Sequence, residues 1–171
     1  YILLLYLPMM ISQTALREIP FSDDYKASWI FQSTPLVRPG EILSGMVKAV
    51  VAGLLLPLYL VISLIVYGIW GNPVIDDILF AAINNYLIVW IMVVIEARRF
   101  PLSLAPNLRA QAGGFLRGLV VLLITVIPSG GHYFLSFVPW SIYVVTPLLL
   151  ALIYYLHQEY LSTPWSKIKL G

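Results

Sequence analysis

The sequence contains no cysteine and few charged residues, and each shortage excludes a class of function. Without cysteine this stretch has no disulfide, no thiolate metal ligand and no cysteine nucleophile. Only 11% of the 171 residues are charged and 60% are hydrophobic, whereas soluble domains have roughly 25% charged residues. The net charge of +2 is small, and no basic run with interleaved aromatics indicates nucleic-acid binding. The composition predicts an integral membrane protein that lies in a lipid bilayer and binds no nucleic acid.

Motifs for catalysis, cofactors and metals are also missing. No GxxxxGK[ST] stretch is present, so the chain cannot bind and hydrolyse ATP by the Walker-type route. His132 and His157 belong to neither an HxxxH nor an HExxH pattern, and the predicted threading places them on opposite sides of the membrane. Asp76 and Asp77 lie at the predicted outer start of a helix, where capping explains them without chemistry. We expect no catalytic pair at a shared membrane depth, no cofactor, no metal site and no enzymatic activity.

Long apolar runs dominate what is present. A helix needs about 20 apolar residues to cross about 30 Å of hydrocarbon, and the runs predict an all-α bundle of about five transmembrane helices in one domain over residues 1–171. The predicted spans cover residues 1–16, 45–70, 78–95, 115–127 and 137–157. The fourth is short, but it can span if Arg117 snorkels or the bilayer thins locally. The chain begins at Tyr1 within an apolar run, so we expect it to belong to a longer polypeptide.

The lysines and arginines predict how the bundle is threaded. All ten lie in or beside residues 17–48, 98–117 and 167–169, and the two remaining connections, 71–77 and 129–136, contain none. Basic residues near membrane ends are retained on the cytoplasmic side. We therefore expect loops 17–44 and 96–114 and the C-terminus to be cytoplasmic, in a bacterial cytoplasmic (inner) membrane.

The first long loop contains an amphipathic pattern. Ser22 is a good helix N-cap, and Phe21, Tyr25 and Trp29 recur every fourth residue, which on a helix forms one aromatic stripe. This pattern predicts a short helix over residues 23–32 that lies on the cytoplasmic membrane surface. Pro35, Pro39 and Gly40 interrupt it before the second span begins.

Small residues spaced by four predict where helices pack. Gly45, Ala49 and Gly53 share this spacing in the second span, and Gly114 and Gly118 repeat it at the fourth. Such faces let two helix backbones approach closely, either within one chain or against a second copy. Pro57 in the second span predicts a bend, for packing or for gating.

Polar residues inside or at the end of the third span have two interpretations each. Asn84 and Asn85 lie within the predicted membrane, where an amide must face protein or water. They either form interhelical hydrogen bonds or line a translocation path. Glu96, Arg98 and Arg99 mark the cytoplasmic exit of this span and either anchor the helix end or share a docking surface with the segment at residues 22–48.

Several strings resemble one family. They are YKASWIF at residues 25–31, PGEILSGMVKA at 39–49, the WG pair before Asp76 and Asp77, and FPLS at 100–103. With them the chain resembles permease subunits of ABC-2-type exporters, which are bacterial multi-helix proteins that work with a separate ATP-hydrolysing subunit. The resemblance covers residues 23–103 and implies a cytoplasmic segment that touches an ATPase and helices that rearrange around an exported cargo.

The expected function is therefore that of an exporter permease. The candidate residues for coupling to the ATPase are Asp24, Tyr25, Lys26 and Trp29. The alternative is a non-catalytic structural subunit of a larger, energy-transducing membrane complex, which the scarcity of intramembrane charge favours. In either case the partners include other membrane subunits or a second copy of the chain.

Overall fold

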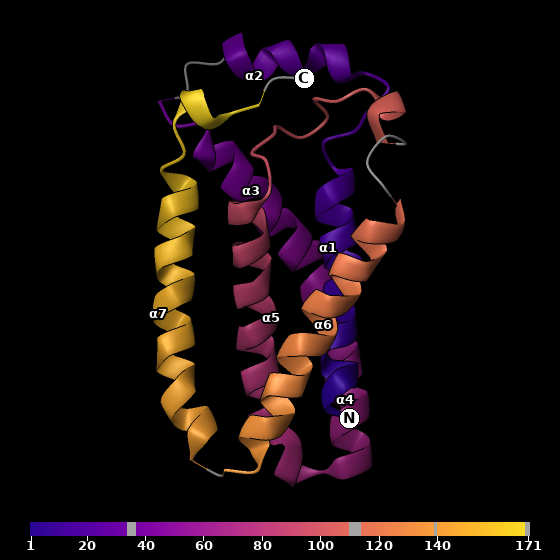
Figure 1. Ribbon diagram of the computed structural model, residues 1–171, viewed down its shortest axis with the longest axis vertical. Helices are drawn as coiled ribbons and strands as arrows, with labels where there is room; N and C mark the ends of the chain where they lie inside the picture. The colour runs from indigo at the N-terminus through magenta and orange to yellow at the C-terminus, as the bar shows by residue number, and fades with distance from the viewer. Residues whose placement is uncertain (34–36, 110–113, 139, 170–171) are drawn as a thin grey trace.

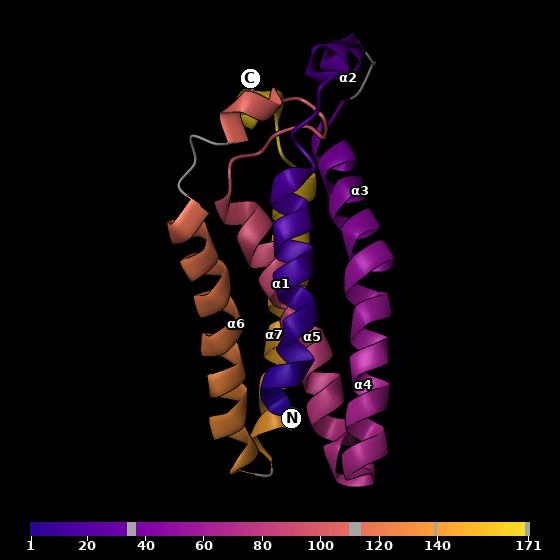
Figure 2. The same cartoon turned by 90° about the vertical axis from the view of Figure 1, so that its right-hand side faces the viewer.

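The computed structural model describes residues 1–33, 37–109, 114–138 and 140–169, with the side chains at 109 and 114–117 outside the description. Its regular elements in these ranges are all helices, as the sequence predicts. Figures 1 and 2 show the long helices running side by side along one axis, with a short helix across one end. The long helices are α1 (Ile2–Glu18), α3 (Gly40–Val50), α4 (Leu56–Trp70), α5 (Ile75–Ile95), α6 (Gly114–Ser136) and α7 (Ser141–Leu161).

Four helical stretches are long and apolar enough to cross a membrane. They are Gly40–Trp70, Asn72–Ile95, Gly118–Ser136 and Ser141–Leu161, which correspond to the second to fifth predicted spans. The first predicted span is α1, which has 17 residues and packs among the others. A fifth crossing by α1 stays a prediction.

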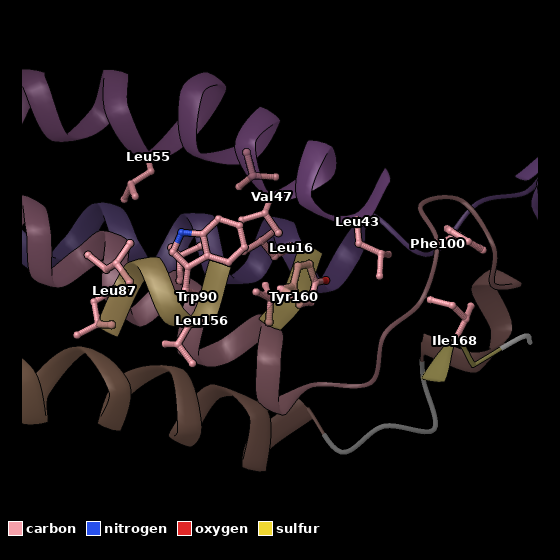
Figure 3. Packing of buried hydrophobic residues seen from close by; sticks show 14 residues of the cluster. Leu16, Leu43, Val47, Leu55, Leu87, Trp90, Phe100, Leu156, Tyr160 and Ile168 are labelled. Carbon is pink, nitrogen blue, oxygen red and sulfur yellow. The ribbon is translucent and has the colours of Figure 1, made fainter. Parts of the chain in front are cut away.

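Helix α1 packs one face against the other helices, while Leu3, Leu7 and Ile11 on its opposite face are exposed. Leu5, Tyr6 and Met9 are fully buried, and they belong to an apolar cluster that includes residues of α4 and α5. A second cluster surrounds the fully buried Trp90 of α5, and Figure 3 shows side chains of α1, α3 and α7 converging on it. The described core thus consists of two apolar clusters, and α1 and α5 contribute residues to both.

Proline alters the helix of the second span. Residues Val51–Leu55 between α3 and α4 form a π-helical turn. Pro57 cannot donate a backbone hydrogen bond to the residue four positions earlier, and a π turn is one way in which a helix accommodates that loss. The predicted irregularity at Pro57 thus lies one turn earlier. Gly71, with φ of +73°, then ends α4 in a conformation that glycine adopts readily.

The predicted end of the fourth span at residue 127 is wrong. Helix α6 continues through Pro128, Ser129 and two glycines to Ser136, although the sequence PSGG is typical of a turn. A segment in lipid must satisfy its backbone polar groups internally, which favours continuing the helix over opening a loop. The Ser129 hydroxyl also donates to the Val126 carbonyl oxygen at 2.9 Å. The extension places His132 inside a helix.

The glycine spacing does not mark close helix contacts within the described chain. A Cβ atom built at Gly45, Gly53 or Gly118 would meet nothing within 4 Å, and the surroundings of Gly114 lie outside the described residues. The interpretation as intramolecular packing is therefore wrong at these three glycines. The intermolecular form of the prediction, which also involves the exposed Ala49, remains.

The basic segments gather at one end of the bundle, which we call the basic end. The C-terminal ends of α1, α5 and α7 and the N-terminal end of α3 all lie there (Figure 1). Arg17 pairs with Glu96 at 2.6 Å and Arg98 with Glu159 at 3.3 Å. Arg38 precedes α3 at the same end, where its carbonyl oxygen accepts from the Glu41 backbone N–H. This matches the gathering that the sequence predicts, while the cytoplasmic assignment of the end stays a prediction.

The helical part of the segment after α1 is shorter than predicted. A 3₁₀ turn (Tyr25–Ser28) leads into α2 (Trp29–Ser33), and Ser22 accepts a hydrogen bond from the Asp24 N–H instead of capping a helix from residue 23. The chain before it is held extended, because the Ser22 N–H donates to the Leu104 carbonyl and the Leu104 N–H donates to the Pro20 carbonyl. These bonds delay the helix start to Tyr25.

Leu102 lies in the loop after α5 with φ of +55°, the only non-glycine residue with positive φ in the described ranges. This conformation costs an ordinary residue about 1–2 kcal/mol, and asparagine tolerates it better. We expect Leu102→Asn to raise the midpoint of thermal unfolding in detergent by roughly 2–4 °C, because the side chain is 53% exposed and loses little burial. Leu108→Asn, an exposed leucine without positive φ, is the control. If the midpoint of thermal unfolding fell equally in both variants, backbone strain at Leu102 would be contradicted.

Candidate functional site

A group of five polar side chains, three of them buried, joins three helices near the end of the bundle opposite the basic end. We call it the polar cluster, and it consists of Tyr1 and Tyr6 at the start of the chain, Asp77 and Asn84 of α5, and His132 of α6. The His132 side chain is 0% exposed and that of Asp77 is 10% exposed. Tyr1 and Asp77 are 76 positions apart in the sequence, and Tyr6 and His132 are 126 positions apart. Only the packing of the bundle brings these residues together.

The hydrogen bonds of the polar cluster form one connected chain. Asp77 accepts at both carboxylate oxygens, from Tyr1 Oη at 2.5 Å and from His132 Nε2 at 3.1 Å. The other imidazole nitrogen, Nδ1, lies 3.3 Å from Tyr6 Oη, and Tyr6 Oη accepts from Asn84 Nδ2 at 3.0 Å. Each helix of the trio contributes at least one member.

The acceptor atoms determine the direction in which these hydrogen bonds are donated. An ionised carboxylate can only accept, so a neutral His132 carries its hydrogen on Nε2 and accepts at Nδ1 from the Tyr6 hydroxyl. Donation then runs from Asn84 through Tyr6 and His132 to Asp77, and Tyr1 donates from the other side. Each of the five side chains thus has at least one hydrogen-bond partner, which is what the buried members require.

The polar cluster has the parts of a proton-holding pair but lacks those of a hydrolytic triad. An imidazole beside a carboxylate can take up and release a proton. Nucleophilic catalysis also needs an accessible hydroxyl or thiol bonded to the imidazole, and the hydroxyl bonded here is that of Tyr6, whose side chain is fully buried. Within the described ranges, no three histidine, aspartate or glutamate side chains come together to hold a metal ion. The geometry fits a polar tie between helices.

The contact between Asp77 and His132 is absent from the sequence interpretation, which expected no acid and histidine at one depth. Ending the fourth helix at residue 127 placed His132 in an outer loop, so its depth was wrong although its side of the membrane matched that of Asp77. The usable signal was that both residues lie next to connections without lysine or arginine, at the same predicted face.

The two asparagines both reach α1. Asn84 donates to Tyr6, and Asn85 Nδ2 donates to the Leu5 carbonyl oxygen at 2.8 Å. The sequence left two alternatives open for these asparagines, and both bonds match the first of them, an interhelical hydrogen bond. Asn85 is 1% exposed, so its amide is fully enclosed by protein.

The candidate coupling residues lie at the basic end, far from the polar cluster. Asp24 and Lys26 are exposed, Tyr25 is half-buried, and the Trp29 side chain is 63% exposed. The segment packs on the loop after α5, where the rings of Phe31 and Phe100 stack with centroids 5.1 Å apart. The loop containing FPLS and the segment after α1 therefore pack against each other, while the shared docking surface stays a prediction.

The fold defines the class of this protein as all-helical, with four helices able to cross a membrane. Comparisons with protein-family models, with curated proteins and with solved structures found no match to this chain. Sequence patterns and the geometry of the two ends are thus the basis for a functional proposal.

Proposed function

We propose that the chain is a membrane-spanning subunit of an ABC-type exporter, which couples a separate ATP-hydrolysing subunit to the movement of a cargo. The observation that supports this most is the segment at residues 24–33, which lies across the basic end outside the long apolar helices (Figure 1). It presents Trp29 together with the exposed Asp24 and Lys26. An exposed tryptophan beside charges is typical of a protein interface.

The connections of this segment explain how a push on it would reach the membrane helices. Phe31 stacks on Phe100 after α5, and the extended residues 20–22 hydrogen-bond to residues 102–104. On the other side, Gly40 at the start of α3 lies against the last turn of α7. Movement of the segment would therefore displace the ends of α1, α3, α5 and α7 together, and the π turn at Val51–Leu55 offers a place where α3 and α4 can bend.

Energy must come from another subunit in this proposal, because the sequence has no Walker-type motif. The experiment is to purify the full-length protein gently from its native membrane and to measure the co-purifying ATP-binding subunit and its ATPase activity. The test variant combines Asp24→Lys, Lys26→Glu and Trp29→Ala. The control is Trp140→Ala, which removes a tryptophan of similar exposure, 65%, between α6 and α7.

We expect the triple variant to lose most of the co-purifying ATPase, or to leave its activity uncoupled from transport, while the control keeps both. The reason is that interface tryptophans and matched charges carry a large share of binding energy. Unchanged co-purification and activity in the triple variant would contradict the coupling role of this segment.

The alternative function, a structural subunit of a larger membrane complex, has one observation in its favour. Gly45, Ala49 and Gly53 lie on an exposed face of α3 and the π turn, with open space at both glycines. Such a face accepts a helix from another chain. The same purification distinguishes the two functions, because a structural subunit would co-purify with cofactor-bearing proteins and without a nucleotide-binding subunit.

A further inference from the structure

A cavity of about 350 Å³ opens at the basic end, between α1, α5 and the loop that follows α5. Its charged lining consists of Arg17, Glu96 and Arg99, and its apolar lining includes Leu16, Met46 and Val120 from three different helices. The cavity is thus amphiphilic, with charges near the helix ends and apolar walls beside them. None of its residues belongs to the polar cluster.

Among the described residues, Arg99 is the charge in this cavity that lacks a counter-ion. Arg17 and Glu96 neutralise each other through a bond of 2.6 Å between Arg17 Nε and Glu96 Oε1. The Arg99 guanidinium forms no ion pair with a described residue, and its Nε is buried there without a hydrogen-bond partner. A buried donor without an acceptor costs about 1–3 kcal/mol. The described lining therefore carries one net positive charge and an unsatisfied N–H group.

The guanidinium geometry selects the chemistry of the ligand. Its fork of N–H groups matches the oxygen pairs of phosphate and carboxylate, and such charge-assisted bonds are about twice as strong as neutral ones. The Nε of neighbouring Arg98 is also buried without a partner, but Arg98 differs because it pairs with Glu159 at 3.3 Å and lies over the ring of Tyr160. Arg99 is the arginine that remains for an anion.

The apolar walls select between a free anion and an amphiphile. Leu16 and Val93 lie in the last turns of α1 and α5, and Met46 and Val120 face the same cavity from α3 and α6. Inorganic phosphate gains nothing from these side chains, whereas an acyl chain gains about 0.8 kcal/mol per buried CH₂ group. Helix ends next to arginines are also the level at which lipid head groups meet hydrocarbon.

We propose that this cavity binds an anionic lipid, with its phosphate or carboxylate head on Arg99 beside Arg17 and its acyl chain along Leu16, Met46, Val93 and Val120. The site is independent of the exporter function, since it needs the bilayer and no ATPase. The lipid would also tie α6 to α1 and α5 at the basic end.

The experiment uses full-length protein in nanodiscs of phosphatidylcholine that contain a minor fraction of phosphatidylglycerol. Lipids retained after transfer to mild detergent are counted by native mass spectrometry for the wild type, Arg99→Gln and the matched control Arg98→Gln. We expect the wild type and Arg98→Gln to retain phosphatidylglycerol preferentially. Arg99→Gln should lower that retention about tenfold, which corresponds to about 1.4 kcal/mol of lost interaction.

Three outcomes would overturn the proposal. They are equal retention by the two variants, no preference of the wild type for phosphatidylglycerol over phosphatidylcholine, and displacement of the lipid by inorganic phosphate at millimolar concentration, which would indicate a site for a free anion. The second comparison uses only wild-type protein, so it decides the matter even if Arg99→Gln does not fold.

Discussion

Replacing His132 by leucine should lower the free energy of unfolding by about 3–5 kcal/mol. The substitution leaves the buried Asp77 carboxylate without the hydrogen bond from the His132 imidazole, and losing a hydrogen bond to a charged group costs about 1.5–3 kcal/mol. It also removes the acceptor of Tyr6, whose hydroxyl is enclosed between α1, α5 and α6. The measurement is reversible unfolding of the purified protein in mixed micelles.

A double variant separates the loss of the pair from the loss of histidine packing. In Asp77→Asn with His132→Leu the buried charge is gone as well, so we expect part of the lost stability to return. The matched control is Asp76→Asn, the neighbouring acid, whose bond to Tyr143 is exposed. It should change stability by less than about 1 kcal/mol. Equal effects of Asp76→Asn and His132→Leu would contradict the polar tie.

Adding one methyl group at Gly40 should destabilise the protein, whereas the same change one turn further along α3 should not. A Cβ atom at Gly40 would lie 2.2 Å from the Leu161 carbonyl oxygen and 2.6 Å from that of Tyr160. Both atoms are backbone, so α3 must move away from α7. We expect Gly40→Ala to cost about 1–3 kcal/mol, as overpacking of a close contact does.

Gly45→Ala is the matched control for this prediction. Nothing lies within 4 Å of its Cβ position, and replacing a glycine inside a helix by alanine gains roughly 0.5–1 kcal/mol. The two variants should therefore shift the thermal midpoint in opposite directions. A shift of the same sign for both would contradict the close approach of α3 to α7.

The helical bundle and its polarity could be predicted from the sequence because both follow from local composition. Apolar runs indicate the long helices, and the positions of Arg17, Arg38, Arg98 and Lys167 predict that two connecting loops and the C-terminal segment gather at one end. The continuation of α6 through Pro128 could not be predicted, because a PSGG sequence favours a turn in water and a helix in a bundle core. The shorter helix near Tyr25 could not be predicted either, because it depends on hydrogen bonds between residues 20–22 and the distant residues 102–104.

The candidate sites show the same division. Asn84 and Asn85 were recognisable, since an amide in an apolar helix needs a partner, but their acceptors on α1 depend on the packing. The pair of Asp77 and His132 depends on contact between α5 and α6 at 55 positions of separation. The sequence analysis interpreted Asp77 and His132 separately, and their contact exists only in the folded bundle.

The proposed function depends most directly on which side of the membrane the basic end faces. This stretch contains no cysteine, so single cysteines at Lys26 and Trp140 of the full-length protein, freed of any other cysteine, report the two ends of the bundle. We predict that a membrane-impermeant maleimide labels Trp140→Cys in intact cells and Lys26→Cys only in inverted vesicles. Labelling of Lys26→Cys in intact cells would place this segment away from any cytoplasmic ATPase and contradict the account.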